Sequence, residues 1–188
     1  MRAFVAVDLA EEVLAEIEKF VARVGARLPG ARFAVPKNLH LTLRFLGESD
    51  ERKIATLSDS LESIGSRYRP FTLRYRGIGF FPSARRPRIF WVGLDDPPEE
   101  LLNIQKDVEA AARLAGFEPE RRAFSPHLTL ARFRNRRPRP HPRFQEIVRE
   151  FEKQDFGTSR VSGLVLYQSI LKREGAEYQA LSRLVLNG

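Results

Sequence analysis

Two short segments of this chain resemble each other and contain residue types suited to acid–base chemistry. Residues 40–47 read HLTLRFLG, and residues 127–134 read HLTLARFR. Each begins with a histidine followed two residues later by a threonine (His40 and Thr42; His127 and Thr129), and the chain has only three histidines. A neutral imidazole can accept a proton while a protonated one donates, so the pair could move protons in opposite directions. Two imidazoles and two hydroxyls could also surround one small anion.

Both segments are typical of β-strands, because leucine alternates with polar residues and neither glycine nor proline interrupts the pattern. Residues i and i+2 of a strand project to the same face, so each histidine points with its threonine and away from the leucines. Strict alternation would place Arg132 on the leucine face, where an unpaired arginine is costly. We therefore expect that the strand bulges or that Arg132 reaches around into the site. Arg44 shares the histidine face, as either a cation at the rim or a solvated residue.

The same residues also have structural interpretations. A single strand histidine is usually structural, and threonine is common in strands for reasons of packing. The duplicated context favours a functional role for His40 and His127. A metal site would need further ligands, yet neither segment contains a carboxylate, and His141 lies between two prolines in a segment expected at the surface. No metal is therefore expected.

Several further segments accompany the pair: MRAFVAVD at 1–8, RPRIFWVG at 86–93, SPHLTLAR at 125–132, and a C-terminal strand pair containing Ser169 and Tyr178. Together these segments resemble the 2H phosphoesterase family, and within it the RNA 2′,3′-cyclic phosphodiesterases, also called 2′-5′ RNA ligases. The resemblance implies a bilobal α+β fold of two antiparallel sheets flanked by helices. It also implies catalysis by the two histidines and phosphate binding by Thr42, Thr129 and Arg132, without metal or cofactor. At the place that matches Arg132, the first segment has Phe45, so the two halves are not interchangeable.

The activity implied by the resemblance is hydrolysis of RNA 2′,3′-cyclic phosphate ends to 2′-phosphomonoesters. We assign His127 as the base that activates water and His40 as the acid that protonates the leaving oxygen, although the pseudo-symmetry leaves the reverse assignment open. The reverse reaction would join RNA ends through a 2′-5′ linkage. A third possibility is a protein that binds RNA ends without catalysis, against which the two intact motifs argue.

Composition sets the class of protein. The chain has 188 residues, of which 43% are hydrophobic and 30% charged, as expected for one folded domain spanning 1–188. Cysteine is absent, which excludes disulfides and thiolate chemistry. No apolar run approaches the roughly twenty residues of a membrane span, and no secretory segment is evident. We therefore expect a cytoplasmic, monomeric protein without a membrane partner.

The net charge of +8 indicates an anionic partner, or else a solvated arginine-rich surface. The arginines that follow the second segment favour contact with RNA phosphates (Arg134, Arg136, Arg137 and Arg139). A second cluster interleaves arginines with aromatic residues at 80–91, a pattern suited to stacking on single-stranded RNA. At least one of Phe90 and Trp91 is expected in the core.

The periodicity of apolar residues predicts alternating helices and strands. Strands are predicted at 2–8, 33–35, 70–79, 87–94, 127–133, 158–168 and 176–186. Helices are predicted to include 13–28, 54–65, 101–114 and 144–151, the first and third after capping pairs at Asp8–Glu11 and Asp96–Glu99. Because each half of the chain contributes one histidine segment, we expect pseudo-two-fold symmetry and a site in the cleft between two lobes.

Overall fold

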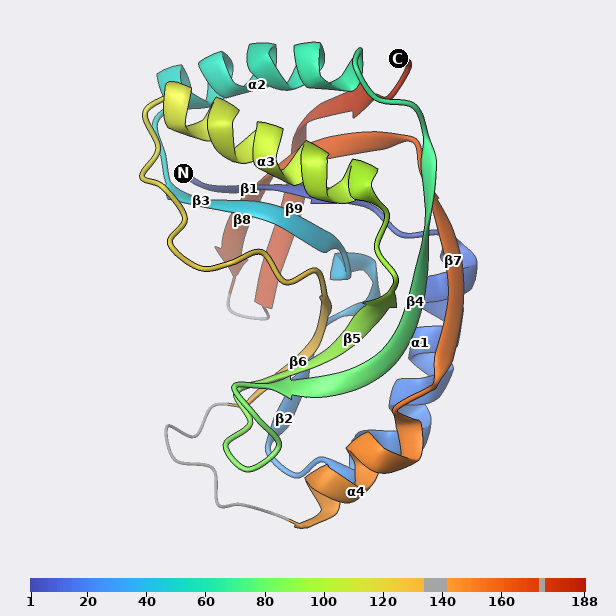
Figure 1. Ribbon diagram of the computed structural model, residues 1–188. Coiled ribbons are helices and arrows are strands. Elements are labelled where there is room, and N and C mark those ends of the chain that lie inside the picture. Colours follow the sequence, from blue (N-terminus) through green and yellow to red (C-terminus); the bar gives the residue numbers. More distant parts are fainter. Residues whose placement is uncertain (134–141, 173–174) are drawn as a thin grey trace.

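The computed structural model describes residues 1–133, 142–172 and 175–188 (Figure 1). The strands are β1 (Arg2–Val7), β2 (Ala31–Phe33), β3 (Leu41–Glu48), β4 (Phe71–Phe81), β5 (Ile89–Asp95), β6 (Leu128–Phe133), β7 (Asp155–Val161), β8 (Gly163–Lys172) and β9 (Gly175–Val185). The helices are α1 (Glu11–Val24), α2 (Glu51–Gly65), α3 (Glu99–Leu114) and α4 (Pro142–Phe151), with the short 3-10 helices η1 (Gly25–Arg27) and η2 (Pro36–Asn38). The predicted α+β class is confirmed.

The strands form two antiparallel halves that meet at the histidine segments. One half contains β3, β1, β8 and β9, and the other contains β7, β4, β5 and β6, with β2 also paired to β6. Among the described residues, β3 and β6 are joined by a single pair, Leu41 with Leu128. The two predicted sheets are therefore joined into one sheet at this single pair of residues. Strands β3 and β6 both start near the pair and, being antiparallel, run away from it in opposite directions.

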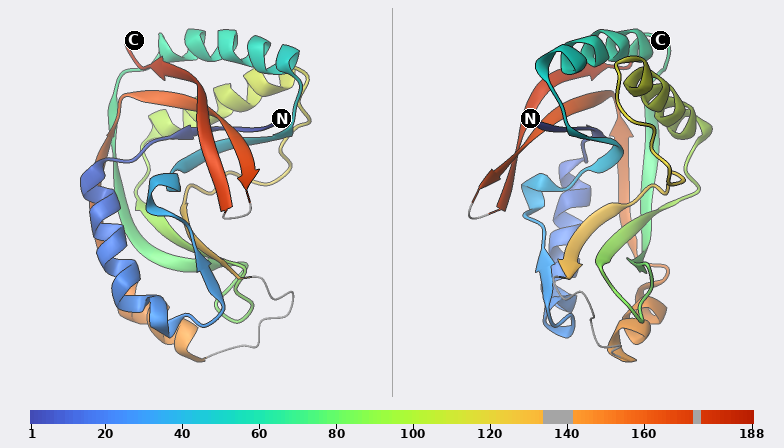
Figure 2. Two further views of the ribbon diagram at one scale, coloured as in Figure 1. Left: turned by 180° about the vertical axis from the view of Figure 1, so that it is seen from behind. Right: turned by 90° about the vertical axis from the view of Figure 1, so that its left-hand side faces the viewer.

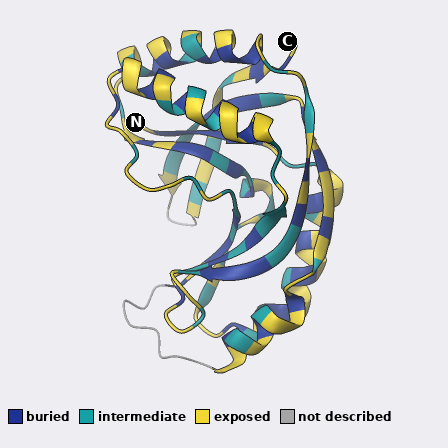
Figure 3. Ribbon diagram, in the orientation of Figure 1, coloured by how far each residue is buried: buried dark blue, intermediate teal, exposed yellow. Residues whose placement is uncertain are grey.

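Helices cover the outer faces of both halves (Figure 2). Helices α2 and α3 pack together over the first half, and α1 packs against β7 in the second. Helix α1 follows β1 in the chain, but it packs on the other half of the sheet, against β7. Each lobe is therefore built from both the N-terminal and the C-terminal half of the sequence. Figure 3 shows the buried residues running along the strands and the inner helix faces.

The local sequence explains the helices. In α1 the buried residues Val13, Ile17, Phe20 and Val24 recur at helical spacing. In α2 the carboxylate of Asp50 caps the helix by accepting from the backbone N–H of Lys53 at 2.9 Å. Neither predicted capping pair forms, because α1 and α3 begin after Ala10 and Pro98 without a side-chain cap. Asp8 instead accepts hydrogen bonds from Tyr167 and Arg183.

Three predicted boundaries were wrong. The short strand expected at 33–35 lies at Ala31–Phe33. The helix expected to reach residue 28 ends at Val24 and continues as η1, although Leu28 is still buried. The strand expected at 158–168 is two strands, because the chain changes partner near Ser162. Strand β7 pairs with β4 in one lobe, and β8 pairs with β1 in the other. Alternation along a sequence does not reveal such a change of neighbour.

Candidate active site

A cleft of about 630 Å³ lies between the two lobes, and all five predicted site residues line it. These are His40, Thr42, His127, Thr129 and Arg132. The Leu41–Leu128 pair brings them together, because the antiparallel register places each histidine beside the threonine of the other segment. The leucines of this pair are fully buried beneath the cleft.

Both imidazoles are oriented by the same kind of hydrogen bond. The Nδ1–H of His40 donates to the carbonyl oxygen of Asn38 at 2.8 Å, and that of His127 donates to the carbonyl oxygen of Ser125 at 2.7 Å. A carbonyl oxygen can only accept, so the proton belongs on Nδ1 in each neutral ring. Each Nε2 is therefore the atom available to accept a proton, or to donate one when the ring is charged.

Aromatic residues pack on both rings. The His40 ring stacks on Phe4 with 4.6 Å between centroids, and Tyr178 contacts it edge-on at 5.2 Å. Phe81 contacts the His127 ring edge-on at 4.9 Å. This burial lowers the pKa of both histidines below the ordinary value, and the charge of Arg132 acts in the same direction. The carboxylate of Asp8 partly opposes the shift at His40.

A β-bulge at the same place in both segments explains the position of Arg132. In β6, Ala131 pairs with Phe90 and Thr129 with Trp91, which leaves Leu130 without a partner on β5. In β3, Arg44 pairs with Val5 and Thr42 with Ala6, which leaves Leu43 unpaired on β1. The extra residue reverses the alternation, so Arg132 returns to the face of Thr129. The first of the two expectations for Arg132 is therefore confirmed.

The same bulge directs Phe45 to the cleft, where its side chain is 51% exposed. Phe45 stands five residues after His40, as Arg132 stands five residues after His127. The sequence shows this correspondence but predicted no role for Phe45. An apolar ring and a guanidinium thus occupy equivalent positions at the two ends of the site.

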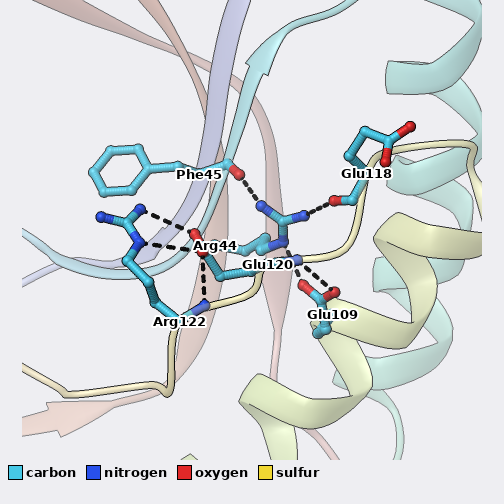
Figure 4. Close-up of polar contacts among 6 residues, drawn as sticks. All are labelled: Arg44, Phe45, Glu109, Glu118, Glu120 and Arg122. Atoms are coloured by element: carbon cyan, nitrogen blue, oxygen red, sulfur yellow. Dashed lines mark hydrogen bonds and ion pairs between the residues drawn. The ribbon is translucent and has the colours of Figure 1, made fainter.

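Arg44 is not a solvated residue, and although it is part of the cleft lining its charge is paired inside the protein. Its side chain is 7% exposed and forms an ion pair with Glu109 of α3 (Figure 4). It also donates to the carbonyl oxygens of Phe45 and Glu118. Glu109 in turn accepts from the backbone N–H of Glu120 at 3.1 Å. Arg44 therefore connects β3 to the segment that leads into His127.

The segment before His127 forms one wall of the cleft. Glu120 accepts hydrogen bonds from the side chain and the backbone N–H of Arg122, and these lower the pKa of Glu120 to about 2 (Figure 4). Arg122, Phe124 and Ser125 also line the cleft. This wall was not predicted, because no periodic or duplicated pattern marks it in the sequence.

The remaining candidates divide between cleft and core. Tyr178 and, from the basic–aromatic cluster, Phe81 and Arg88 line the cleft. Phe90 is fully buried, as expected for at least one residue of that pair. Ser169 pairs with Tyr178 across β8 and β9 and is not part of the cleft lining. The predicted arginine-rich loop and His141 fall at 134–141, outside the described residues.

Within the described ranges, no three histidine, aspartate or glutamate side chains are grouped so that they could hold a metal ion. In the same part of the chain, no helix is long and apolar enough to cross a membrane. The predicted site residues bring imidazole, hydroxyl and guanidinium groups to the cleft, and such groups suit a phosphate better than a cation.

A sequence model described as LigT like Phosphoesterase matches the chain twice, over residues 7–91 and 92–178. The chain belongs to this family. Each match contains one histidine segment, in agreement with the inferred duplication. In this chain the two matched halves are interleaved in space, because α1 of the first half packs against β7 of the second.

Similar proteins cover nearly the whole chain. An RNA 2′,3′-cyclic phosphodiesterase of Aeropyrum pernix is 37% identical over 89% of this chain and 92% of its own length. One of Archaeoglobus fulgidus is 32% identical over 96% and 98%. Among solved structures, TT0787 of Thermus thermophilus superposes with a TM-score of 0.83, at 31% identity and over 100% and 99% of the two chains. LigT of E. coli in complex with 3′-AMP gives a TM-score of 0.75, at 29% identity and over 100% and 98%.

Proposed function

We propose that this protein hydrolyses RNA 2′,3′-cyclic phosphate ends to 2′-phosphomonoesters. The observation that carries the proposal is the matched pair of imidazoles, each with Nδ1 held by a carbonyl and Nε2 free, beside two threonines in one cleft. The names of the relatives from Aeropyrum pernix and Archaeoglobus fulgidus support the same substrate class.

In the proposed reaction one imidazole takes a proton from water as the water oxygen bonds to phosphorus. The bond between phosphorus and the ribose 3′ oxygen breaks, and the other, protonated imidazole gives its proton to that oxygen. In-line displacement requires base and acid on opposite sides of phosphorus, which two antiparallel segments with one histidine each can provide. The hydroxyls of Thr42 and Thr129 and the guanidinium of Arg132 would bind the non-bridging oxygens.

We assign His40 as the acid and His127 as the base. The carboxylate of Asp8 favours the charged form of His40, and no carboxylate of the described residues does the same for His127. Burial is the largest cause of the lowered pKa at both rings, so the assignment rests on this one favourable charge near His40. Arg132 disfavours the charged form of both rings in the free protein, and bound phosphate would offset that effect.

Phe45 would serve as a stacking surface for the nucleobase. Its ring is half-exposed, lines the cleft and contacts Phe4 at 6.0 Å between centroids, which limits its motion. Stacking on an aromatic ring tolerates any base, so this contact would favour a nucleotide over a simple phosphate ester. A cytoplasmic location and a monomeric state remain predictions from the sequence.

Product analysis tests the proposal. A short RNA ending in a 2′,3′-cyclic phosphate is incubated with the protein in EDTA, with and without a second RNA that carries a 5′-hydroxyl. A 2′-phosphate as the main product would support the proposal. A 2′-5′-linked RNA as the main product would make ligation the principal activity, and tight binding without turnover would indicate a protein that only binds RNA ends.

A further inference from the structure

A second arginine stands beside Arg132 in the sheet. In the short ladder between β2 and β6, Arg32 pairs directly with Arg132. Directly paired residues on antiparallel strands project to the same face, with Cβ atoms about 5 Å apart. Because Arg132 lines the cleft, Arg32 faces the same side, one strand further from the histidines.

This pairing is unfavourable in the protein alone. Like charges directly opposite each other destabilise a strand pair. Both arginines are exposed, and neither forms an ion pair with any carboxylate that the structure describes. Arg76 of β4 by contrast forms an ion pair with Asp95 of β5 at 3.1 Å. An anion bound between Arg32 and Arg132 would relieve the repulsion.

The two guanidiniums differ in their relation to the reacting centre. The charge of Arg132 lowers the pKa of His40 and of His127, whereas Arg32 is not among the groups that shift either pKa. Arg132 and both histidines line the cleft, whereas Arg32 is not part of its lining and lies one strand beyond Arg132. The next residues across the same row of the sheet are Ile89 and Phe81, which are apolar and line the cleft. Across the strands β2, β6, β5 and β4, these neighbouring side chains thus change from two arginines to two apolar residues.

We propose that Arg32, next to Arg132 on the side away from the histidines, forms a second phosphate subsite that binds the 5′-phosphoryl group of the nucleotide whose cyclic phosphate reacts. In an RNA chain this group is the phosphodiester that links the terminal nucleotide to the preceding one. The subsite would make RNA ends better substrates than free nucleoside cyclic phosphates. The proposal rests on the proposed function of the same cleft.

The test compares two small substrates that differ in one group. They are a nucleoside 2′,3′-cyclic phosphate with a 5′-hydroxyl and the same compound with a 5′-phosphate. At low salt we expect the protein to show a kcat/KM roughly three- to tenfold higher for the 5′-phosphorylated compound, as for one partly exposed charge contact. Arg32→Ser should bring this ratio close to one, and Arg32→Lys should retain part of it.

Arg52→Ser is the matched control, since it removes one exposed positive charge from the first turn of α2 and should leave the ratio unchanged. Thermal unfolding should show Arg32→Ser to be at least as stable as the parent, because the variant removes a repulsion. A parent ratio near one, or a ratio that survives Arg32→Ser, would overturn the subsite. If the parent turns over neither compound, the proposed function fails. The subsite is then tested by the dissociation constants of the two compounds, measured by calorimetry. Parent binding that does not favour the 5′-phosphorylated compound, or a preference that survives Arg32→Ser, would overturn it.

Discussion

Leu41 of β3 and Leu128 of β6 form the pair of residues through which the two halves of the sheet are hydrogen-bonded in the described part of the chain. Each leucine directly follows a histidine of the cleft. The junction therefore fixes the relative position of His40 and His127, while the strands separate on either side of it. The separation provides space for a substrate, and the single pair keeps the two imidazoles in register.

Replacing His40 or His127 with alanine should reduce kcat by about 10²–10⁴-fold, the usual contribution of a general acid or base. The fold should persist, because both rings lie at the cleft surface and not in the main core. Single-turnover rates measure the loss, and circular dichroism checks the fold. Near-normal turnover in either variant would contradict the two-histidine mechanism.

The pH dependence of kcat/KM should be bell-shaped with its maximum on the acid side of the ordinary histidine pKa, about 6.5. Burial lowers the pKa of both histidines in the free protein. The base gains activity as pH rises through its lowered pKa, and the acid loses its proton at a lowered pKa as well. Bound phosphate favours the charged imidazole, so the maximum of kcat should lie at higher pH than that of kcat/KM.

Arg132 provides an internal check on this assignment. Its charge lowers the pKa of both rings, so Arg132→Met should shift both limbs of the kcat/KM profile to higher pH while reducing kcat/KM overall. A profile that rises steadily into strongly alkaline conditions would show that no protonated histidine is required.

Turnover should persist after exhaustive dialysis against EDTA, because the two imidazoles account for both proton transfers and the described part of the cleft presents no set of metal ligands. The initial rate on a nucleoside 2′,3′-cyclic phosphate, measured with and without added Mg²⁺ or Zn²⁺, provides the check. Activity lost in EDTA and restored by a divalent ion would refute this prediction.

Arg44→Met should lower the free energy of unfolding by about 3 kcal/mol, since it leaves the largely buried carboxylate of Glu109 without its partner. The double variant Arg44→Met/Glu109→Leu should recover much of this loss, because it removes both charges. Urea unfolding measures both effects. An equal or larger loss in the double variant would show that Glu109 contributes mainly through its bond to the backbone of Glu120.

The sequence by itself determined the chemistry and the local structure around it. The duplicated His-x-Thr spacing identified the four residues that meet in the cleft, since the period of two in a strand is a local property of the backbone. Helical periodicity likewise located the buried faces of α1 and α2. These predictions hold because they depend only on residues close together in the chain.

Only the tertiary structure decided what depends on pairing between distant segments. The bulges at Leu43 and Leu130 arise from register with β1 and β5, and they turn Phe45 and Arg132 toward the cleft. Arg44 resembles a surface cation in the sequence, but α3 brings Glu109 against it and buries the pair. The placement of α1 on the opposite lobe is of the same kind, because hydrogen bonds and packing between remote strands leave no periodic signal in the sequence.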